Sequence, residues 1–120
     1  MTMDPSIVHQ LVEDVPPGEV ASYGMIASLL SGVGPRQVAR AMRSAPKGLP
    51  WYRIVTSSGK TADHSGAVRQ RSLLKKEGVV FRKNGAVDWS VCRWKGPSPF
   101  WIEVTGADVE FIMETIAGWG

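Results

Sequence analysis

Three arginines, Arg36, Arg40 and Arg43, are spaced so that they would share one face of a helix. Guanidinium groups in such a row can bind backbone phosphates of a nucleic acid, because each is permanently charged and donates several hydrogen bonds. The apolar residues of the same segment, among them Val38 and Met42, would face elsewhere. The pattern has two interpretations: a solvated basic face on a core helix, or a recognition helix that faces DNA.

The charges of the chain are strongly segregated, which favours the DNA-facing helix. All 14 Lys and Arg residues lie between Arg36 and Lys95, where they accompany three acids and give that segment a net charge of +11. Residues 1–35 and 96–120 contain no Lys or Arg and four acids each. A solvated surface usually mixes its signs. This distribution therefore indicates a polyanionic partner, with nucleic acid first and an acidic lipid surface second.

A second candidate is Trp51, which stands in the segment LPWYRIV, residues 49–55. Exposing a tryptophan to solvent is costly, and a buried tryptophan is rarely this close in sequence to an arginine without a reason. Here one residue separates Trp51 from Arg53. The indole N–H only donates a hydrogen bond, so Trp51 cannot act as a nucleophile. It is either a plain core tryptophan or an aromatic pocket wall. Combined with the basic face, the second interpretation predicts a small nucleic-acid-binding domain.

The other reactive residue types stand without the partners that their chemistry needs. Cys92 has no His nearby in the sequence, and we interpret it as a packing residue. His9 and His64 lack metal-ligand spacing. The stretch SSGKT, residues 57–61, ends like a phosphate-binding loop, but Ile54 stands where that loop needs a glycine. We therefore expect neither a metal nor a cofactor.

Composition also bounds the cellular setting. A single cysteine excludes an internal disulfide and favours a reducing compartment. Residues 1–10 lack the basic start and apolar core of a signal peptide, and no apolar run is long enough to span a membrane. We expect a soluble protein that has no membrane partner. Its expected location is the cytoplasm, where it would be associated with the nucleoid, or the nucleus if the source is a eukaryote.

The arginine row belongs to a predicted helix-turn-helix. Residues 5–15 have helical apolar spacing behind Asp4, a favourable N-cap. A second helix follows Ser22, and after the break SGVG a third helix opens at Pro35. Two short helices around a tight turn, the second of them basic, are typical of DNA-binding proteins.

Smaller elements complete the predicted domain. An extended segment is expected over residues 52–56, then a fourth helix that ends before Gly78, then a hairpin at Asn84-Gly85 that could form a wing. The predicted fold class is mainly α with a small β-hairpin, a winged-helix-like DNA-binding domain over residues 1–95. Residues 96–120 would be an acidic extension, with one amphipathic helix packed on the domain.

Six motifs occur in an order and spacing that resembles the DNA-binding domain of O6-alkylguanine-DNA alkyltransferases. They are PPGEVASYGMIA, PRQVARAM, PWYRIV, SSGK, HSG and RQRSLLKKEGV, and the resemblance runs from about Pro5 to Lys95. In these enzymes the central motif is Pro-Cys-His-Arg, and its cysteine takes the alkyl group from the damaged guanine. Trp51 stands at the position of the cysteine. The chain is thus similar to the alkyltransferase-like proteins, inactive relatives that hold the damaged base and flag it for nucleotide excision repair.

The resemblance implies a role for several residues. Tyr23 matches the tyrosine that pushes against the phosphate of the flipped nucleotide, and Arg36 matches the arginine that enters the duplex and fills the vacated stack. Arg53 matches the arginine of the central motif. Ser65 matches a serine of the binding loop, and Glu77 matches the glutamate of the proton relay.

Three positions depart from the pattern of the enzymes. Tyr52 replaces the motif histidine, Ala45 replaces an asparagine near the end of the recognition helix, and His64 stands where some relatives have an arginine that contacts the base. The residues expected to bind DNA are Tyr23, Arg36, Arg40 and Arg43. The residues expected to form the alkylguanine pocket are Trp51, Tyr52, Arg53, His64 and Ser65.

Together these features imply a monomeric, non-enzymatic protein that docks in the minor groove of double-stranded DNA and flips an O6-alkylguanine. Flipping fits the chemistry, because a modified O6 atom is inaccessible inside a duplex. Nucleotide excision repair proteins would be the partners. Three alternatives stay open: an alkyltransferase that uses Cys92, a winged-helix transcription regulator, and a module whose basic face binds a protein.

Overall fold

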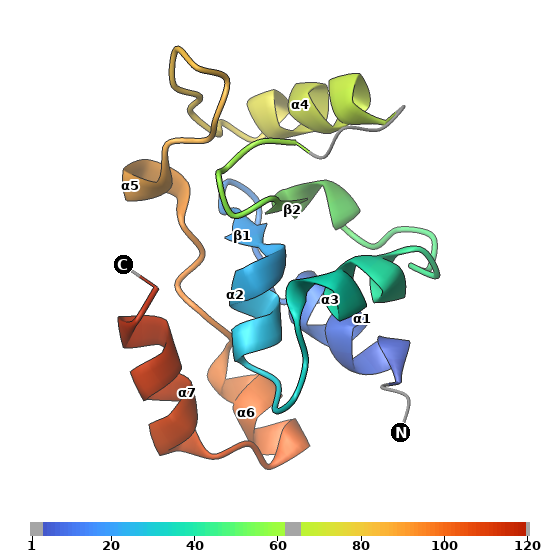
Figure 1. Ribbon diagram of the computed structural model, residues 1–120, viewed down its shortest axis with the longest axis vertical. Helices are drawn as coiled ribbons and strands as arrows, with labels where there is room; N and C mark the ends of the chain where they lie inside the picture. Colours follow the sequence, from blue (N-terminus) through green and yellow to red (C-terminus); the bar gives the residue numbers. More distant parts are fainter. Residues whose placement is uncertain (1–3, 62–65, 120) are drawn as a thin grey trace.

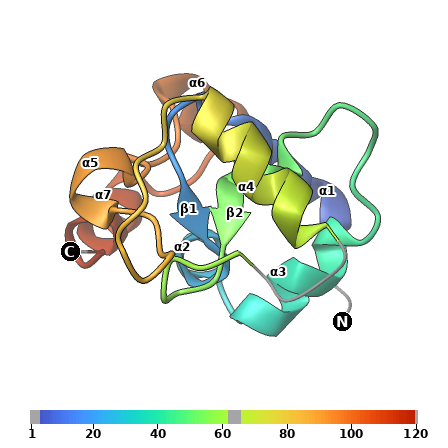
Figure 2. The ribbon, with the colours of Figure 1, turned by 90° about the horizontal axis from the view of Figure 1, so that it is seen from above.

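The structure is a computed structural model that describes residues 4–61 and 66–119. Most of it is helical, and the helices surround a two-stranded sheet (Figures 1 and 2). The elements in chain order are α1 (Pro5–Glu13), β1 (Ala21–Ser22), α2 (Tyr23–Ser28), α3 (Pro35–Met42), the 3-10 helix η1 (Trp51–Arg53), β2 (Ile54–Val55), α4 (Ala67–Lys76), α5 (Trp89–Cys92), α6 (Pro99–Thr105) and α7 (Val109–Ala117).

The helix-turn-helix forms where the sequence predicts it, because its helix starts are encoded locally. Asp4 caps α1 by accepting a hydrogen bond from the Ser6 amide at 3.0 Å. Ser22 caps α2 by accepting from the Met25 amide at 3.0 Å, and Pro35 occupies the first turn of α3. Helices α2 and α3 pack on each other and on α1 around a shared apolar core.

The sheet differs from the predicted hairpin. Strand β1 pairs in parallel with β2, with Ala21 opposite Ile54, and both strands are buried. The segment around Asn84 does turn back on itself, but it forms one isolated antiparallel bridge between Phe81 and Val87. The pairing stops there because Asp88 accepts a hydrogen bond from the Ser90 amide at 3.1 Å and starts α5.

The C-terminal extension holds two helices, whereas the sequence analysis predicted one. Helix α6 starts behind Ser98, whose hydroxyl accepts a hydrogen bond from the Trp101 amide at 3.2 Å. It ends at Gly106, which has a left-handed backbone conformation with φ of 68°. Asp108 then caps α7. The predicted amphipathic helix is present as α7, and α6 is an additional helix that the stop at Gly106 separates from it.

The extension contributes side chains to the same core cluster as the helix-turn-helix. Trp101 and Ile112 are buried in that cluster, and Trp119 stacks on Trp94 with ring centroids 5.8 Å apart. Gly96 has a φ of 107°, a backbone conformation that favours glycine, and it lies against the Ile116 side chain of α7. Division of the chain into domains at residue 95 remains a prediction.

Within residues 4–61 and 66–119, no helix combines the length and the apolar character that crossing a bilayer requires.

Candidate nucleic-acid interface

The basic face of α3 is exposed. Arg36 and Arg40 project from the helix and Arg43 caps its C-terminal end, and all three are solvent-exposed. Val38 and Ala41 on the other face of α3 are buried in the core. The helix therefore presents a cationic surface that is supported from behind by apolar packing, an arrangement suited to binding phosphates.

Tyr23 is the first residue of α2 and is half-buried against the core. Burial raises the pKa of Tyr23 above its usual value of 10, so the phenol stays protonated at neutral pH. A protonated hydroxyl can donate a hydrogen bond to a phosphate oxygen.

Trp51 belongs to neither of the two clusters of buried side chains, in contrast to Trp94 and Trp101. It is half-buried at the start of η1, and its ring stands almost perpendicular to that of Tyr52, with centroids 5.9 Å apart and an interplanar angle of 88°. A partly exposed indole held by a neighbouring ring favours the pocket-wall interpretation over a plain core tryptophan.

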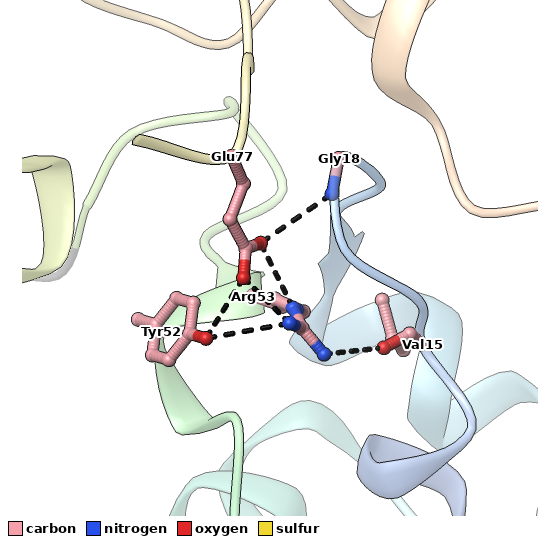
Figure 3. Close-up of polar contacts among 5 residues, drawn as sticks. All are labelled: Val15, Gly18, Tyr52, Arg53 and Glu77. Atoms are coloured by element: carbon pink, nitrogen blue, oxygen red, sulfur yellow. Dashed lines mark hydrogen bonds and ion pairs between the residues drawn. The ribbon is translucent and has the colours of Figure 1, made fainter. Parts of the chain in front are cut away.

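Behind Trp51, the side chains of Tyr52, Arg53 and Glu77 form one hydrogen-bonded cluster (Figure 3). The Tyr52 hydroxyl donates to Glu77 Oε2 at 2.8 Å. Arg53 donates to both carboxylate oxygens, from Nε at 2.9 Å and from Nη2 at 2.5 Å. Arg53 Nη1 reaches the carbonyl of Val15 at 2.9 Å, and the Gly18 amide adds a hydrogen bond to Glu77 at 3.4 Å. The cluster ties η1 to the end of α4 and to the loop after α1.

This cluster fixes the protonation states of its members. Burial and then the hydrogen bond to Glu77 raise the pKa of Tyr52 above 10. Burial also opposes ionisation of Glu77, but the hydrogen bonds from Arg53 and Tyr52 outweigh it and hold the pKa of this carboxyl below 4.5. At neutral pH the cluster is therefore a protonated phenol and a carboxylate bound to a guanidinium, and Tyr52 is a poor proton acceptor.

The structure assigns Arg53 a positioning role that the sequence analysis missed. Its Nε, Nη1 and Nη2 atoms all donate inside the protein. Arg53 thus orients Tyr52 and Glu77. Of the other expected pocket residues, His64 and Ser65 lie outside the described part of the chain.

Gln70 is a further supporting residue that the sequence analysis missed. It is buried on α4, and its amide nitrogen donates to the carbonyls of Ile54 at 2.8 Å and Tyr52 at 3.2 Å. It therefore holds the backbone that carries Trp51. A polar residue four positions before Leu74, on the inner face of α4, is the sequence signal that could have revealed it.

Cys92 lies elsewhere, in the second core cluster with Val20 and Leu74. Its thiol donates to the Asp88 carbonyl at 3.1 Å, and burial raises the pKa of Cys92. A buried thiol of raised pKa is a weak nucleophile. Among the residues that the structure describes, no three or more His, Cys, Asp or Glu side chains gather as metal ligands would.

Fold and site together define a helix-turn-helix DNA-binding domain with a partly exposed tryptophan at the start of η1. The family model for the DNA-binding domain of 6-O-methylguanine DNA methyltransferase matches residues 6–79, and the chain belongs to this family.

Within the family, the chain is similar to alkyltransferase-like proteins, which confirms that resemblance. It is 38% identical over 95 residues to the DNA base-flipping protein of Escherichia coli strain K12, covering 75% of this chain and 73% of that protein. It is 33% identical over 78 residues to alkyltransferase-like protein 1 of Schizosaccharomyces pombe, covering 60% and 72%.

Solved structures confirm the mainly helical fold class. The crystal structure of S. pombe Atl1 in complex with damaged DNA containing O6-carboxymethylguanine matches with a TM-score of 0.66 and 30% identity, over 79% of this chain and 99% of that chain. The O6-methylguanine methyltransferase of Mycobacterium tuberculosis matches with a TM-score of 0.54 and 32% identity, over 61% and 47%.

Proposed function

We propose that this protein binds O6-alkylguanine in double-stranded DNA, holds the nucleotide flipped out of the duplex, and does not transfer the alkyl group. The observation that carries the proposal is the pair Trp51 and Tyr52. Trp51 stands where the enzymes have the nucleophilic cysteine, and the Tyr52 hydroxyl donates a hydrogen bond to Glu77 at 2.8 Å. Position 51 therefore carries no nucleophile, and position 52 carries no proton acceptor, for the transfer reaction.

The DNA-binding part of the proposal assigns roles to the exposed residues. Arg40 and Arg43 bind phosphates along the minor groove, and Arg36 enters the stack that the flipped nucleotide leaves. Tyr23 braces the phosphate of that nucleotide. Support comes from the exposed basic face of α3 and from relatives that are named for base flipping and seen with alkylated DNA.

The pocket part of the proposal assigns the flipped base to a site walled by Trp51. An indole face offers stacking area to the base and apolar surface to the alkyl group. Tyr52 and Arg53 keep the backbone of η1 in place through Glu77. His64 and Ser65, outside the described residues, are proposed to complete the pocket.

A protein that holds a lesion without repairing it serves repair only if another protein acts next. We infer that the monomeric complex with the flipped base, formed in the compartment that holds the DNA, recruits nucleotide excision repair proteins. Two features of the complex would supply the structural signal: the bound protein itself, and a bend that the inserted Arg36 would introduce into the duplex.

Two measurements test this function. A fluorescent base analogue placed opposite O6-methylguanine reports unstacking, and its emission should rise on binding of the wild type and much less with Arg36→Ala. Mass spectrometry after prolonged incubation should find the protein unmodified and the methyl group still on the DNA. A protein gaining the mass of a methyl group would overturn the proposal in favour of an alkyltransferase, with Cys92 as the acceptor to map.

A further inference from the structure

A groove of about 620 Å³ lies between α1, the segment 48–53 and α6. Phe100 and Val104 of α6 line it, and so do Glu13 and Asp14 at the end of α1. Seen from above, in Figure 2, α6 and the basic helix α3 lie at opposite edges of the molecule. The groove is therefore accessible while the basic face of α3 is on DNA.

The apolar wall of the groove is unusually exposed. Phe100 is 74% and Val104 is 66% exposed, and their i, i+4 spacing puts them on one face of α6. Exposed large apolar side chains next to each other in a groove mark an interaction site, because their burial by a partner is favourable.

The groove carries acidic side chains. Glu13 and Asp14 line it, and the guanidinium of Arg53, which also lines it, is already paired with Glu77. The two carboxylates favour a partner that carries Lys or Arg.

The groove also includes part of an indole ring. Trp101 lines it and is 7% exposed, so its ring adds apolar surface beside Phe100 and Val104.

The walls are held in place before any partner arrives. Asp14 accepts hydrogen bonds from both the amide and the hydroxyl of Ser98, the latter at 3.0 Å, which fixes the start of α6 to the end of α1. The groove is therefore preformed, and binding loses little entropy in ordering it.

We propose that this groove binds a short segment of a partner protein, with an apolar side chain set between Phe100 and Val104 and Lys or Arg residues facing Glu13 and Asp14. The partner protein is the next repair factor if the proposed function holds. The groove shares Tyr52 and Arg53 with the expected alkylguanine pocket, whereas Phe100 and Val104 lie outside that pocket. Occupancy of the groove is therefore measured without DNA.

A displayed library of short random peptides, panned on the intact wild-type protein, is the probe. The selected sequences should combine an apolar residue with an excess of Lys and Arg. Their binding should weaken by about tenfold or more in Phe100→Ser/Val104→Ser, the scale of an interface anchor, and should fall in Glu13→Lys. Val109→Ser, an exposed apolar residue of α7 outside the groove lining, is the matched control and should bind normally.

The readout for position is the indole N–H resonance of Trp101, which a selected peptide should shift in a saturable way while that of Trp89, outside the groove lining, stays unchanged. No selected peptide, a selection without basic residues, or full binding to the double variant would overturn the inference. If the wild type self-associated and the double variant did not, the inference would also be overturned, because the groove would then bind a second copy of this protein. Affinity for alkylated duplexes, measured on the same variants, should be unchanged, which separates failure here from failure of the proposed function.

Discussion

Replacing Trp51 with Cys should not create an alkyltransferase. An unperturbed thiol has a pKa of about 8.5, so only about 3% of it is thiolate at pH 7. The residue that would have to accept its proton is Tyr52, whose hydroxyl donates to Glu77 at 2.8 Å. Burial raises the pKa of Tyr52 above 10. Less than about 0.1% of it is therefore a base at pH 7.

The double variant Trp51→Cys/Tyr52→His is the matched control. A histidine with a pKa of about 6.5 is mostly neutral at pH 7, so one ring nitrogen can accept the thiol proton while the other donates to Glu77. A positioned general base contributes roughly 10²–10⁴-fold to a rate. The double variant should therefore transfer at least about 100-fold faster than the single variant.

Mass spectrometry of each variant, incubated with a duplex that contains one O6-methylguanine, follows the transferred methyl group. Both variants also lose the indole of Trp51, so the affinity of each should fall by about 1–3 kcal/mol, the scale of base–aromatic stacking. The rates are therefore compared at saturating duplex. Equal transfer by the two variants would refute the reasoning, because Tyr52 would then be no obstacle.

Three further predictions concern the DNA face and the cluster behind Trp51. Arg36→Ala should cost about 1–3 kcal/mol on duplex DNA and less on a single strand, where no stack needs filling; equal losses in parallel titrations would make Arg36 a plain affinity residue. The logarithm of affinity should fall linearly with the logarithm of salt concentration, with a slope of about −0.9 per contacted phosphate, and Arg40→Ala should reduce that slope by roughly one contact on damaged and normal DNA alike; an unchanged slope would contradict this. Because the pKa of Glu77 is lowered in the fold, the stability it provides is present above pH 4.5 and lost as the pH falls through the folded value. Glu77→Gln should therefore lower the free energy of unfolding at pH 7 by about 1–3 kcal/mol and flatten its acid dependence in urea titrations; an acid dependence as steep as that of the wild type would count against it.

The helix-turn-helix could be predicted from the sequence because its signals are local. Asp4, Ser22 and Pro35 each mark a helix start within a few residues, and the arginine spacing identifies the exposed face of α3. The apolar period of the tail predicts α7, and the same capping rules would have found α6, since Ser98 is also an N-cap.

The cluster of Tyr52, Arg53 and Glu77 could not be predicted from spacing. Glu77 lies 24 residues after Arg53, and the two meet only because α4 packs on η1. The family resemblance identified each of these residues but not the hydrogen bond that the Tyr52 hydroxyl donates to Glu77. The two-residue strands β1 and β2 were equally inaccessible, because a strand of that length has no period to recognise.

The central claim is that this protein prefers alkylated guanine, and one ratio tests it most directly. Fluorescence anisotropy gives the dissociation constants for two duplexes of identical sequence, one of which carries a single O6-methylguanine. We expect the methylated duplex to bind at least about tenfold more tightly, a difference of about 1.4 kcal/mol, and Trp51→Ala to remove most of that preference. Equal affinity of the wild type for both duplexes would contradict the account and leave a general DNA-binding protein in its place.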